Sequence, residues 1–509
     1  METTQTEFRP NILLIVIDQF RYDLLSQDGL GRVAQLPNLR QLLENAVSFA
    51  NHFTVTVPCG PSRASLFTGQ YAFNHRAVRN GTPLRYDIPN LARAMRQAGY
   101  VPRMFGYTDT THDPRVLPPD DLRLQSYEEL LPGFEEELRM RMESDVSAWH
   151  SHLSQRGIDL PPYPDTYRPN GPEIVDPALY PAELSDTAFL SDQFLSKMQN
   201  IEQGWFATLT YIRPHSPLVA PAPYNTLYDP QDMPAPTCTH DPNGDRNWHP
   251  FLAPAQDKQP ISSMVVGFPD LENDPEAIAQ LRAVYLALAT EVDHHIGRLV
   301  DWLKTSSQWD NTVLIVTADH GEMLGDFGLW GKGTFHDAAY HVPLIVRDPA
   351  RPDMHGRVHF GFTESIDIPT TILKRVGSET PSSMNGRNLV GILDDTETEG
   401  ADYSFSEFDF GNPIDPTPWM IKQGLTSRQA NLGILRTKKH RLVEFGAGLP
   451  QVLFDMDACG EVVSVAERPE NTQTLLHLTR KMLDHRMNNA DPTFAQTLVR
   501  AGGVKTGSH

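Results

Sequence analysis

The stretch NILLIVID, residues 11–18, is a run of apolar and largely β-branched side chains that ends in an aspartate. Such a run is typical of a parallel strand that is covered on both faces. Similar runs occur at GWFATLTYI (204–212), NTVLIVTADHG (311–321) and HVPLIVRD (341–348). Helical patterns lie between them, and the longest covers about 275–304. This alternation predicts an α/β fold in which a large, mostly parallel sheet is sandwiched by helices.

Two features divide the rest of the 509-residue chain. Residues 113–183 and 214–270 are rich in proline and polar side chains, and segments of this length usually wall a site or form an oligomer contact. From about residue 376 the alternation stops, and NLGILRTKKHRLVEF and QVLFDM indicate short antiparallel strands. We predict a large domain over 1–375, a smaller C-terminal α+β domain over 376–490 that ends in a helix, and a tail over 491–509.

The composition narrows the classes of partner. The chain carries 43 Lys and Arg against 64 Asp and Glu residues, a net charge of −21, which repels nucleic acid and anionic lipid. The three cysteines, Cys59, Cys238 and Cys459, lie far apart and predict no disulfide framework, which fits a reducing compartment. The N-terminal apolar run is too short for a membrane span and has no basic region before it. We therefore expect no signal peptide, no membrane association and a cytoplasmic location.

Polar side chains follow two of the predicted strands at the point where each strand ends. Asp18 ends the first run, and Asp319 and His320 end the run VLIVTADHG. Either carboxylate alone is best explained as a helix cap or a loop residue. Because open α/β sheets place their ligands at the carboxyl ends of the strands, the two together indicate a shared metal site. Carboxylate oxygens combined with an imidazole nitrogen suit a borderline divalent ion.

The stretch CGPSRASLFTG, residues 59–69, combines a rare cysteine with an arginine. A plain helix start explains Pro61 and a capping Ser62, but not Cys59 and Arg63. A helix N-terminus beside an arginine is an anion site, and a thiolate is stabilised there. We therefore expect an oxyanion-bearing electrophile, a metal and an activated group in one place.

This stretch resembles the sulfatase signature Cys-x-Pro-Ser/Ala-Arg-x-x-x-Leu-Thr-Gly. The positions that match are Cys59, Pro61, Ser62, Arg63, Thr68 and Gly69, and Phe67 replaces the leucine. Further stretches, including NILLIVIDQFRYDLL, YIRPHSPLVAPAPYNTLYDPQDMPAP and TADHGEMLGDFGLWGKG, are similar to the bacterial phosphonate monoester hydrolase and arylsulfatase branch of the alkaline phosphatase superfamily. The resemblance implies an alkaline phosphatase-like fold for the large domain. It also implies that Cys59 is oxidised to formylglycine by a maturation enzyme, and that the hydrate of this aldehyde is the nucleophile.

The resemblance also assigns the metal site. It implies that Asp18, the modified Cys59, Asp319 and His320 are the ligands of one divalent ion. Gln19 stands where many sulfatases have a second aspartate. With one carboxylate fewer and a histidine present, Mn²⁺ is favoured and Ca²⁺ is the alternative.

Other roles carry over from the resemblance one residue at a time. Arg63 is expected to hold the formylglycine hydrate, and His215 and Lys332 to bind the anion and assist the leaving oxygen. The expected substrate contacts are Gln19, Asn80, Tyr107 and Asp109. Tyr107 resembles the phosphonate hydrolase branch, whereas Asp109 matches neither branch, and a carboxylate near an anionic substrate needs a cation beside it. We expect Asp109 either to pair with a cation and influence substrate choice, or to cap the loop GYTDTTHD.

These features predict a formylglycine- and metal-dependent hydrolase of small monoanionic esters. The first interpretation is a sulfatase for aryl sulfate monoesters that also hydrolyses phosphonate monoesters and phosphodiesters. The alternatives are a primary phosphonate monoester hydrolase or phosphodiesterase, a non-catalytic metal- or anion-binding homologue, and a phosphomutase-like enzyme with an unmodified residue. The long insertions and the tail also suggest a homo-oligomer, a dimer or tetramer.

Overall fold

Eight strands form one central sheet in the computed structural model, which describes residues 9–506 except 239–245, 398, 494 and 496. Their order is β4 (Glu135–Arg139), β3 (Pro102–Gly106), β5 (Phe206–Tyr211), β1 (Asn11–Ile17), β6 (Thr312–Ala318), β7 (Leu344–Arg347), β2 (Val47–Phe53) and β8 (Val358–Glu364). Strand β7 is antiparallel to its neighbours β6 and β2, and the other neighbouring pairs are parallel. The predicted mixed, mostly parallel sheet is therefore confirmed.

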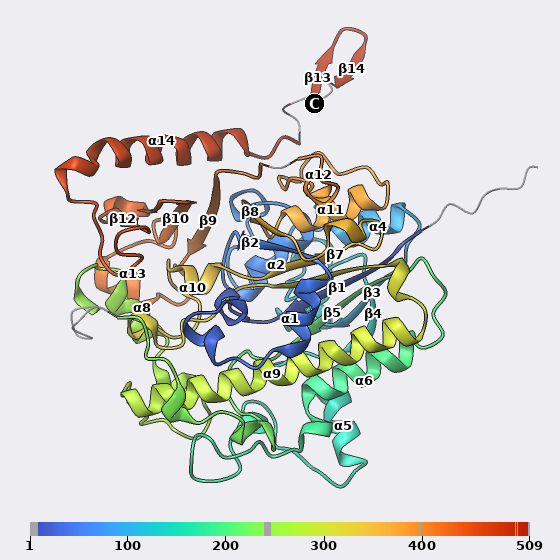
Figure 1. Ribbon diagram of the computed structural model, residues 1–509. Helices are drawn as coiled ribbons and strands as arrows, with labels where there is room; N and C mark the ends of the chain where they lie inside the picture. The colour runs from blue at the N-terminus through green and yellow to red at the C-terminus, as the bar shows by residue number, and fades with distance from the viewer. Residues whose placement is uncertain (1–8, 239–245, 398, 494, 496, 507–509) are drawn as a thin grey trace, which may run out of the picture.

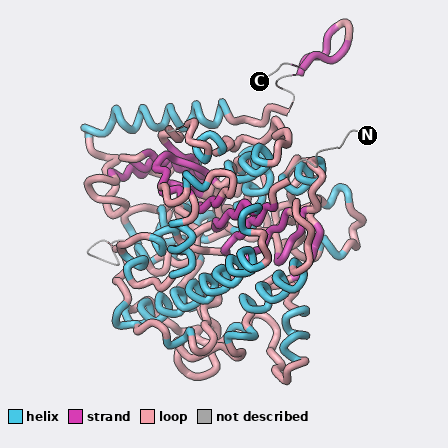
Figure 2. The backbone as a smooth tube through the Cα atoms, turned by 45° about the vertical axis from the view of Figure 1, so that its right-hand side comes forward, coloured by secondary structure: helices cyan, strands magenta, loops and turns pink. Residues whose placement is uncertain are grey.

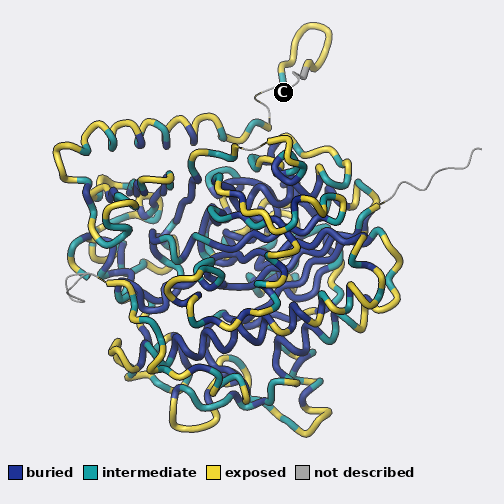
Figure 3. Tube along the Cα trace, viewed as in Figure 1, coloured by how far each residue is buried: buried dark blue, intermediate teal, exposed yellow. Residues whose placement is uncertain are grey.

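The central strand β1 explains why its sequence is apolar throughout. Leu13, Ile15 and Ile17 pack in one cluster with α1 (Pro37–Glu44), α6 (Asp186–Met198) and α9 (Pro275–Thr305). The alternate residues of β1 pack in a second cluster with α2 (Cys59–Thr68), α4 (Leu91–Gln97) and α11 (Asp367–Arg375). Figure 1 shows α9 and α6 side by side along one face of the sheet, and Figure 3 shows the strands as the most buried part of the molecule. Both faces of the sheet are thus covered, as the continuous apolar run predicts.

The ends of two helices follow from local sequence. The long helix α9 begins at Pro275, and the side chain of Asp274 accepts hydrogen bonds from the backbone N–H groups of Glu276 and Ala277. These are the usual signals of a helix start. Helix α2 ends at Gly69, which has φ +65°, the left-handed conformation that glycine adopts with least strain.

The C-terminal part adds a separate four-stranded antiparallel sheet. Its strands, in sheet order, are β12 (Val452–Asp455), β11 (His440–Phe445), β10 (Asn431–Thr437) and β9 (Tyr403–Asp409), and α14 (Thr472–Asn488) covers it. The segment between the two sheets still packs on the large one, because Met384, Leu389 and Ile392 share an apolar cluster with β1. The smaller α+β unit predicted from the sequence is confirmed, and a division of the chain at residue 376 stays a prediction.

The last described strands form a hairpin that stands away from the body, β13 (Thr497–Arg500) with β14 (Gly503–Thr506) (Figures 1 and 2). Residues 1–8 and parts of the predicted tail lie outside the described residues, so the structure does not test the expectation of no signal peptide and covers the tail only in part. Among the described helices, none combines the length and the apolar character needed to cross a membrane.

Candidate active site

Hydrogen-bonded pairing of β1 with β6 brings the two predicted metal-binding stretches together. Ile17 and Ala318 are partners in the register of the two strands, so Asp18 and Asp319 follow at the same edge of the sheet. The backbone N–H of Gln19 donates to Asp319 Oδ1 at 3.1 Å, which locks the two strand ends to each other. The carboxylates of Asp18 and Asp319 therefore converge because of the sheet, although the two residues lie far apart in the sequence.

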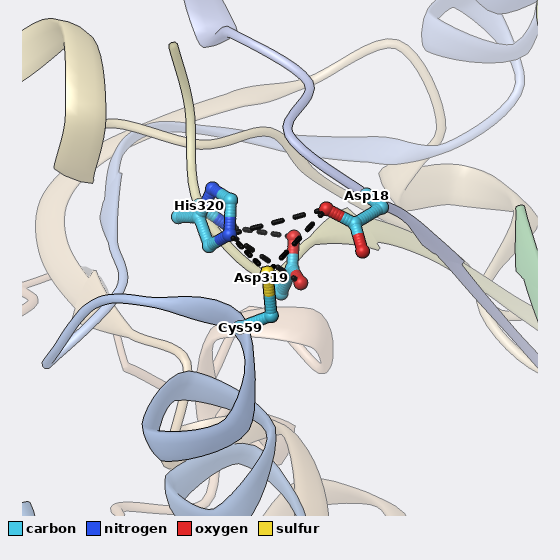
Figure 4. Close-up of side chains that lie close together, drawn as sticks. All are labelled: Asp18, Cys59, Asp319 and His320. Carbon is cyan, nitrogen blue, oxygen red and sulfur yellow. Dashed lines mark hydrogen bonds and ion pairs between the residues drawn. The ribbon is translucent and has the colours of Figure 1, made fainter. Parts of the chain in front are cut away.

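Helix α2 presents Cys59 to the same point. The Cys59 sulfur lies 3.1 Å from His320 Nε2 and 4.0 Å from Asp18 Oδ1. One potential ligand atom from each of Asp18, Cys59, Asp319 and His320 falls within 4.8 Å of all the others, and all four residues are buried (Figure 4). Two carboxylates, an imidazole and residue 59 form a donor set that fits a borderline divalent cation.

The electrostatics of this cluster favour a cation between the carboxylates. Burial, with the nearby charge of Asp319, raises the pKa of Asp18. Burial acts on Asp319 in the same direction, but His320 and Arg63 outweigh it and lower the pKa of Asp319 to about 2. Burial also lowers the pKa of His320, which leaves the imidazole neutral and able to act as a ligand.

Arg63 lies between the two carboxylates and is fully buried. Its Nε donates to Asp319 Oδ2 at 2.9 Å and its Nη2 to Asp18 Oδ2 at 3.0 Å, while its guanidinium lies 4.5 Å from the ring centre of Tyr107. The Tyr107 hydroxyl donates to the same Asp18 oxygen at 2.5 Å. In this arrangement Arg63 and Tyr107 orient Asp18, whereas the sequence suggested that Arg63 would contact the nucleophile and Tyr107 the substrate.

Two further polar side chains, Lys332 and His215, line the same cavity as Cys59. Lys332 Nζ donates to Gln19 Oε1 at 2.7 Å and lies 2.8 Å from His215 Nε2. Because Nδ1 of His215 lies 2.5 Å from the carbonyl oxygen of Ser216, the proton sits on Nδ1 and Nε2 accepts from the lysine. Burial and the charge of Lys332 lower the pKa of His215 well below its usual value, in agreement with a neutral ring.

Gln19 takes no part in the metal cluster. Its Oε1 accepts the hydrogen bond from Lys332, and its Nε2 donates to the carboxylate of Glu322. Glu322 was missed in the sequence, although it comes only two residues after His320. Gln19 and Glu322 together fix the ammonium group of Lys332 in position.

Asn80 and Asp109 stand beside the N-terminus of α2. Asn80 Oδ1 accepts from the backbone N–H of Gly60 at 2.9 Å, which leaves its Nδ2 as a free-standing donor group. Asp109 Oδ2 lies 3.8 Å from Arg63 Nε, so the carboxylate does lie beside a cation, and its Oδ1 accepts no hydrogen bond. Burial raises the pKa of Asp109 well above its usual value. Its influence on substrate choice stays a prediction.

A cavity of about 250 Å³ connects these side chains. Seven of the predicted residues line it: Asp18, Cys59, Asn80, Tyr107, Asp109, His215 and Lys332. The two proline-rich segments supply the other walls, Tyr127, Glu128, Met142, Glu143 and Tyr163 from the first and Ser216, Pro217, Gln259 and Ser263 from the second. The expectation that these segments wall a site is confirmed, but no motif in them identified the individual residues.

Comparisons with known proteins agree with this site. Residues 10–378 match the family model named Sulfatase. The multifunctional alkaline phosphatase superfamily protein PehA of Trinickia caryophylli is 35% identical over 98% of this chain and 100% of its own length. The solved structure of the phosphonate monoester hydrolase SpPMH from Silicibacter pomeroyi has a TM-score of 0.95 and 49% identity, and covers 98% of this chain and 99% of its own. The phosphonate monoester hydrolase of Agrobacterium radiobacter has a TM-score of 0.91 and 36% identity, with 98% and 100% covered. With its fold, its motif and nearly three quarters of its length matched, the chain belongs to the sulfatase family.

Proposed function

We propose that the protein is a metal- and formylglycine-dependent hydrolase of small monoanionic esters, and that aryl sulfate monoesters and phosphonate monoesters are cleaved at the same site. The observation that carries this proposal is the position of Cys59. Its sulfur lies at the N-terminus of α2, 3.1 Å from His320 and in the cavity that Lys332 lines. A nucleophile, a metal-binding cluster and a cation for the leaving group are thus within one small cavity.

Asp18, residue 59, Asp319 and His320 would hold the metal, for which we propose Mn²⁺, with Ca²⁺ as the alternative. When bound, a divalent ion acts as a Lewis acid on the ester oxygens and lowers the pKa of the hydrated aldehyde derived from Cys59. We further propose that a formylglycine-generating enzyme supplies this modification.

The chain's own residues prepare the site for an anion. Arg63 and Tyr107 hold Asp18 in one orientation by donating to its Oδ2. Asn80 Nδ2 is available to donate to a substrate oxygen, since the Oδ1 of the same amide is fixed by Gly60. Burial lowers the pKa of Lys332, but the nearby negative charges, among them those of Asp18 and Asp319, outweigh it and hold this pKa above its usual value. Lys332 therefore stays charged at neutral pH and can donate a proton or a hydrogen bond to the departing oxygen.

His215 supports this role of Lys332. Its neutral Nε2 accepts from the ammonium at 2.8 Å and so directs the remaining protons of Lys332 toward the cavity. With Gln19 as a second acceptor, the lysine is restricted to a narrow range of positions. Such fixed donors contribute to catalysis because they need no rearrangement as charge develops on the leaving oxygen.

A second candidate, a primary phosphonate monoester hydrolase, is favoured by the 49% identity to SpPMH over nearly the whole chain. Sulfate monoesters and phosphonate monoesters both carry a single negative charge, so the metal cluster suits both. We propose to compare kcat/KM for an aryl sulfate and for the phenylphosphonate ester of the same phenol on metal-loaded, fully modified protein. A higher value for the sulfate supports the first candidate, and a higher value for the phosphonate supports the second.

Two other candidates, a non-catalytic homologue and a phosphomutase-like enzyme with an unmodified residue 59, are tested by intact mass. Formylglycine is about 18 Da lighter than cysteine. We also propose a cytoplasmic location and a homo-oligomeric state, dimer or tetramer, on the basis of the cysteine content and the C-terminal hairpin.

A further inference from the structure

The cavity beside Cys59 has two walls of different chemistry. The wall that carries Lys332 and His215 is suited to an anion. The remaining wall carries three carboxylates, Asp109, Glu128 and Glu143, and the phenol rings of Tyr127 and Tyr163. An ester whose only charge is negative would gain nothing from this acidic wall.

No ion pair with an arginine is found for Glu128 or Glu143 among the described residues, whereas Asp109 has only the distant contact with Arg63. Glu128 accepts from the backbone N–H groups of Glu143 and Ser144, at 3.1 and 2.7 Å, but these donors supply no positive charge. Burial raises the pKa of Glu128, and the hydrogen bonds oppose this effect only in part. Arg139 and Arg141, which lie close to Glu143 in the sequence, pair with carboxylates outside the cavity lining.

Asp109 gives the strongest indication that this wall binds a ligand. The residue is 6% exposed and lines the cavity, yet its Oδ1 has no hydrogen-bond partner in the part of the chain that the structure describes. Among the described residues the ion-pair partner of Asp109 is Arg63, which lies 3.8 Å away and already donates to Asp18 and Asp319. A buried carboxylate oxygen without a donor is costly, and a positively charged ligand group would remove this cost.

The aromatic rings complete the arrangement. Tyr127 and Tyr163 line the cavity together with Asp109 and Glu143. Burial raises the pKa of Tyr127, and the charges of Asp109 and Glu143 add to this effect. Burial and the charge of Glu143 likewise raise the pKa of Tyr163 to about 12. Phenol rings beside carboxylates form the surroundings in which alkylammonium groups are bound, since the ring face attracts a cation.

We propose that the organic group of the natural substrate carries a positive charge, as an alkylammonium group bound by Asp109, Glu143, Tyr127 and Tyr163 while the sulfate or phosphonate lies at Cys59. The inference rests on the proposed function and specifies its substrate class. The substrate is then a zwitterion whose two charges match the two walls of the cavity.

The test uses two isosteric aryl sulfates, one with a para trimethylammoniomethyl group and one with a neutral para neopentyl group, and the same pair as phenylphosphonate esters. For each pair, kcat/KM of the cationic ester is divided by kcat/KM of the neutral ester. This ratio is measured in the wild type and in Asp109→Asn and Glu143→Gln. The control is Asp484→Asn, which removes an exposed charge from α14. Comparing ratios cancels the difference in leaving-group reactivity and any general loss of activity. We expect the ratio to fall about tenfold in Asp109→Asn and Glu143→Gln and to stay unchanged in the control.

Equal ratios in all four proteins would overturn the inference while leaving the proposed function intact. Glu143 is exposed, so Glu143→Gln carries the test even if Asp109→Asn does not fold. If the wild type hydrolyses none of the esters, the proposed function fails, and binding of benzyltrimethylammonium by calorimetry then decides. Weaker binding in Glu143→Gln than in the wild type supports the cation site, and equal or undetectable binding in both overturns it.

Discussion

Cys59 lies in surroundings that do not suit an ordinary structural thiol. Burial raises the pKa of this thiol well above its usual value, and the charge of Asp18 adds to the effect. An unmodified cysteine here would therefore stay protonated and react poorly. We expect Cys59→Ala to fold normally and to lose activity by at least about a thousandfold, measured as kcat on an aryl sulfate or phosphonate ester.

The control for this variant is Cys459→Ala, which removes a half-buried cysteine far from the cavity. Its kcat should equal that of the wild type, and only the Cys59 peptide should show the mass loss of the aldehyde. Substantial turnover by Cys59→Ala would contradict the formylglycine mechanism.

The metal cluster makes a separate prediction about binding. Asp319→Ala and His320→Ala each remove one of the four donors, and three remaining donors hold a divalent ion less tightly. We expect both variants to contain well under one metal ion per chain by elemental analysis, and to lose activity in proportion. Asp353→Ala, an exposed carboxylate elsewhere, should retain the full content. Full metal content in either cluster variant would remove that residue from the ligand set.

For individual residues, the sequence predicted which side chains lie together in the candidate active site, but not which contacts they make with one another. Strand ends and a helix start are local signals in the sequence. They were enough to predict that Cys59 and Arg63 lie near Asp18 and Asp319. The contacts of Arg63 with Asp18 and Asp319 depend on side-chain directions that only packing decides. The partner of Gln19, Glu322, was missed for the same reason.

The loop after β5, which carries His215, is held by a buried arginine. Arg213 pairs with Asp186 of α6 at 3.0 Å, and its Nη1 donates to the carbonyl oxygens of His215 and Pro217 at 2.9 and 2.8 Å. Arg213→Met would leave the buried Asp186 without its ion-pair partner and release these carbonyls. We expect a loss of about 3–5 kcal/mol in stability and a lower kcat at unchanged metal content, because His215 no longer holds Lys332 in position.

The matched control is Arg298→Met, which breaks an ion pair between α9 and the same helix α6. Arg298 and Asp192 lie 2.7 Å apart but are 46% and 43% exposed. Breaking such a pair should cost less than about 1 kcal/mol and leave kcat unchanged. If both variants behaved alike in thermal unfolding and in kcat, Arg213 would have no positioning role.

Elements with a single strong pattern were predicted well. The strand at 11–17 and the helix at about 275–304 correspond to β1 and to α9 (Pro275–Thr305), because continuous apolar runs and long helical periodicity leave few alternatives. Strands β2 and β8 were missed, since VSFANHF and VHFGFTE mix polar and apolar residues. Their pairing with each other and with β7 is a long-range choice that no local pattern specifies.

At the scale of the whole molecule, the exposed hairpin β13–β14 predicts that copies of this chain associate into an oligomer. An isolated two-stranded hairpin is marginally stable in water, and Leu498, Val499 and Val504 are 53%, 82% and 65% exposed. Truncation after Ala490 keeps Asn489, whose carbonyl accepts from Asn74 and Asn385, so the body should fold. We expect a smaller oligomer than the full chain forms, measured by light scattering during gel filtration, with metal content retained. The same mass for both proteins would contradict this prediction.

The burial of Cys59 limits the period during synthesis and folding in which another enzyme can reach its thiol. In the folded chain this residue is 5% exposed and opens only onto a cavity of about 250 Å³, which admits a small ester but not the active site of another enzyme. The sheet above it closes when β1 is flanked by β5 and β6, and β6 lies some 250 residues further along the chain than Cys59. During synthesis Cys59 is therefore accessible until a large part of the sequence has followed it. Under the proposed formylglycine mechanism, oxidation of the thiol has to be finished within that interval, and a chain that folds first would stay inactive.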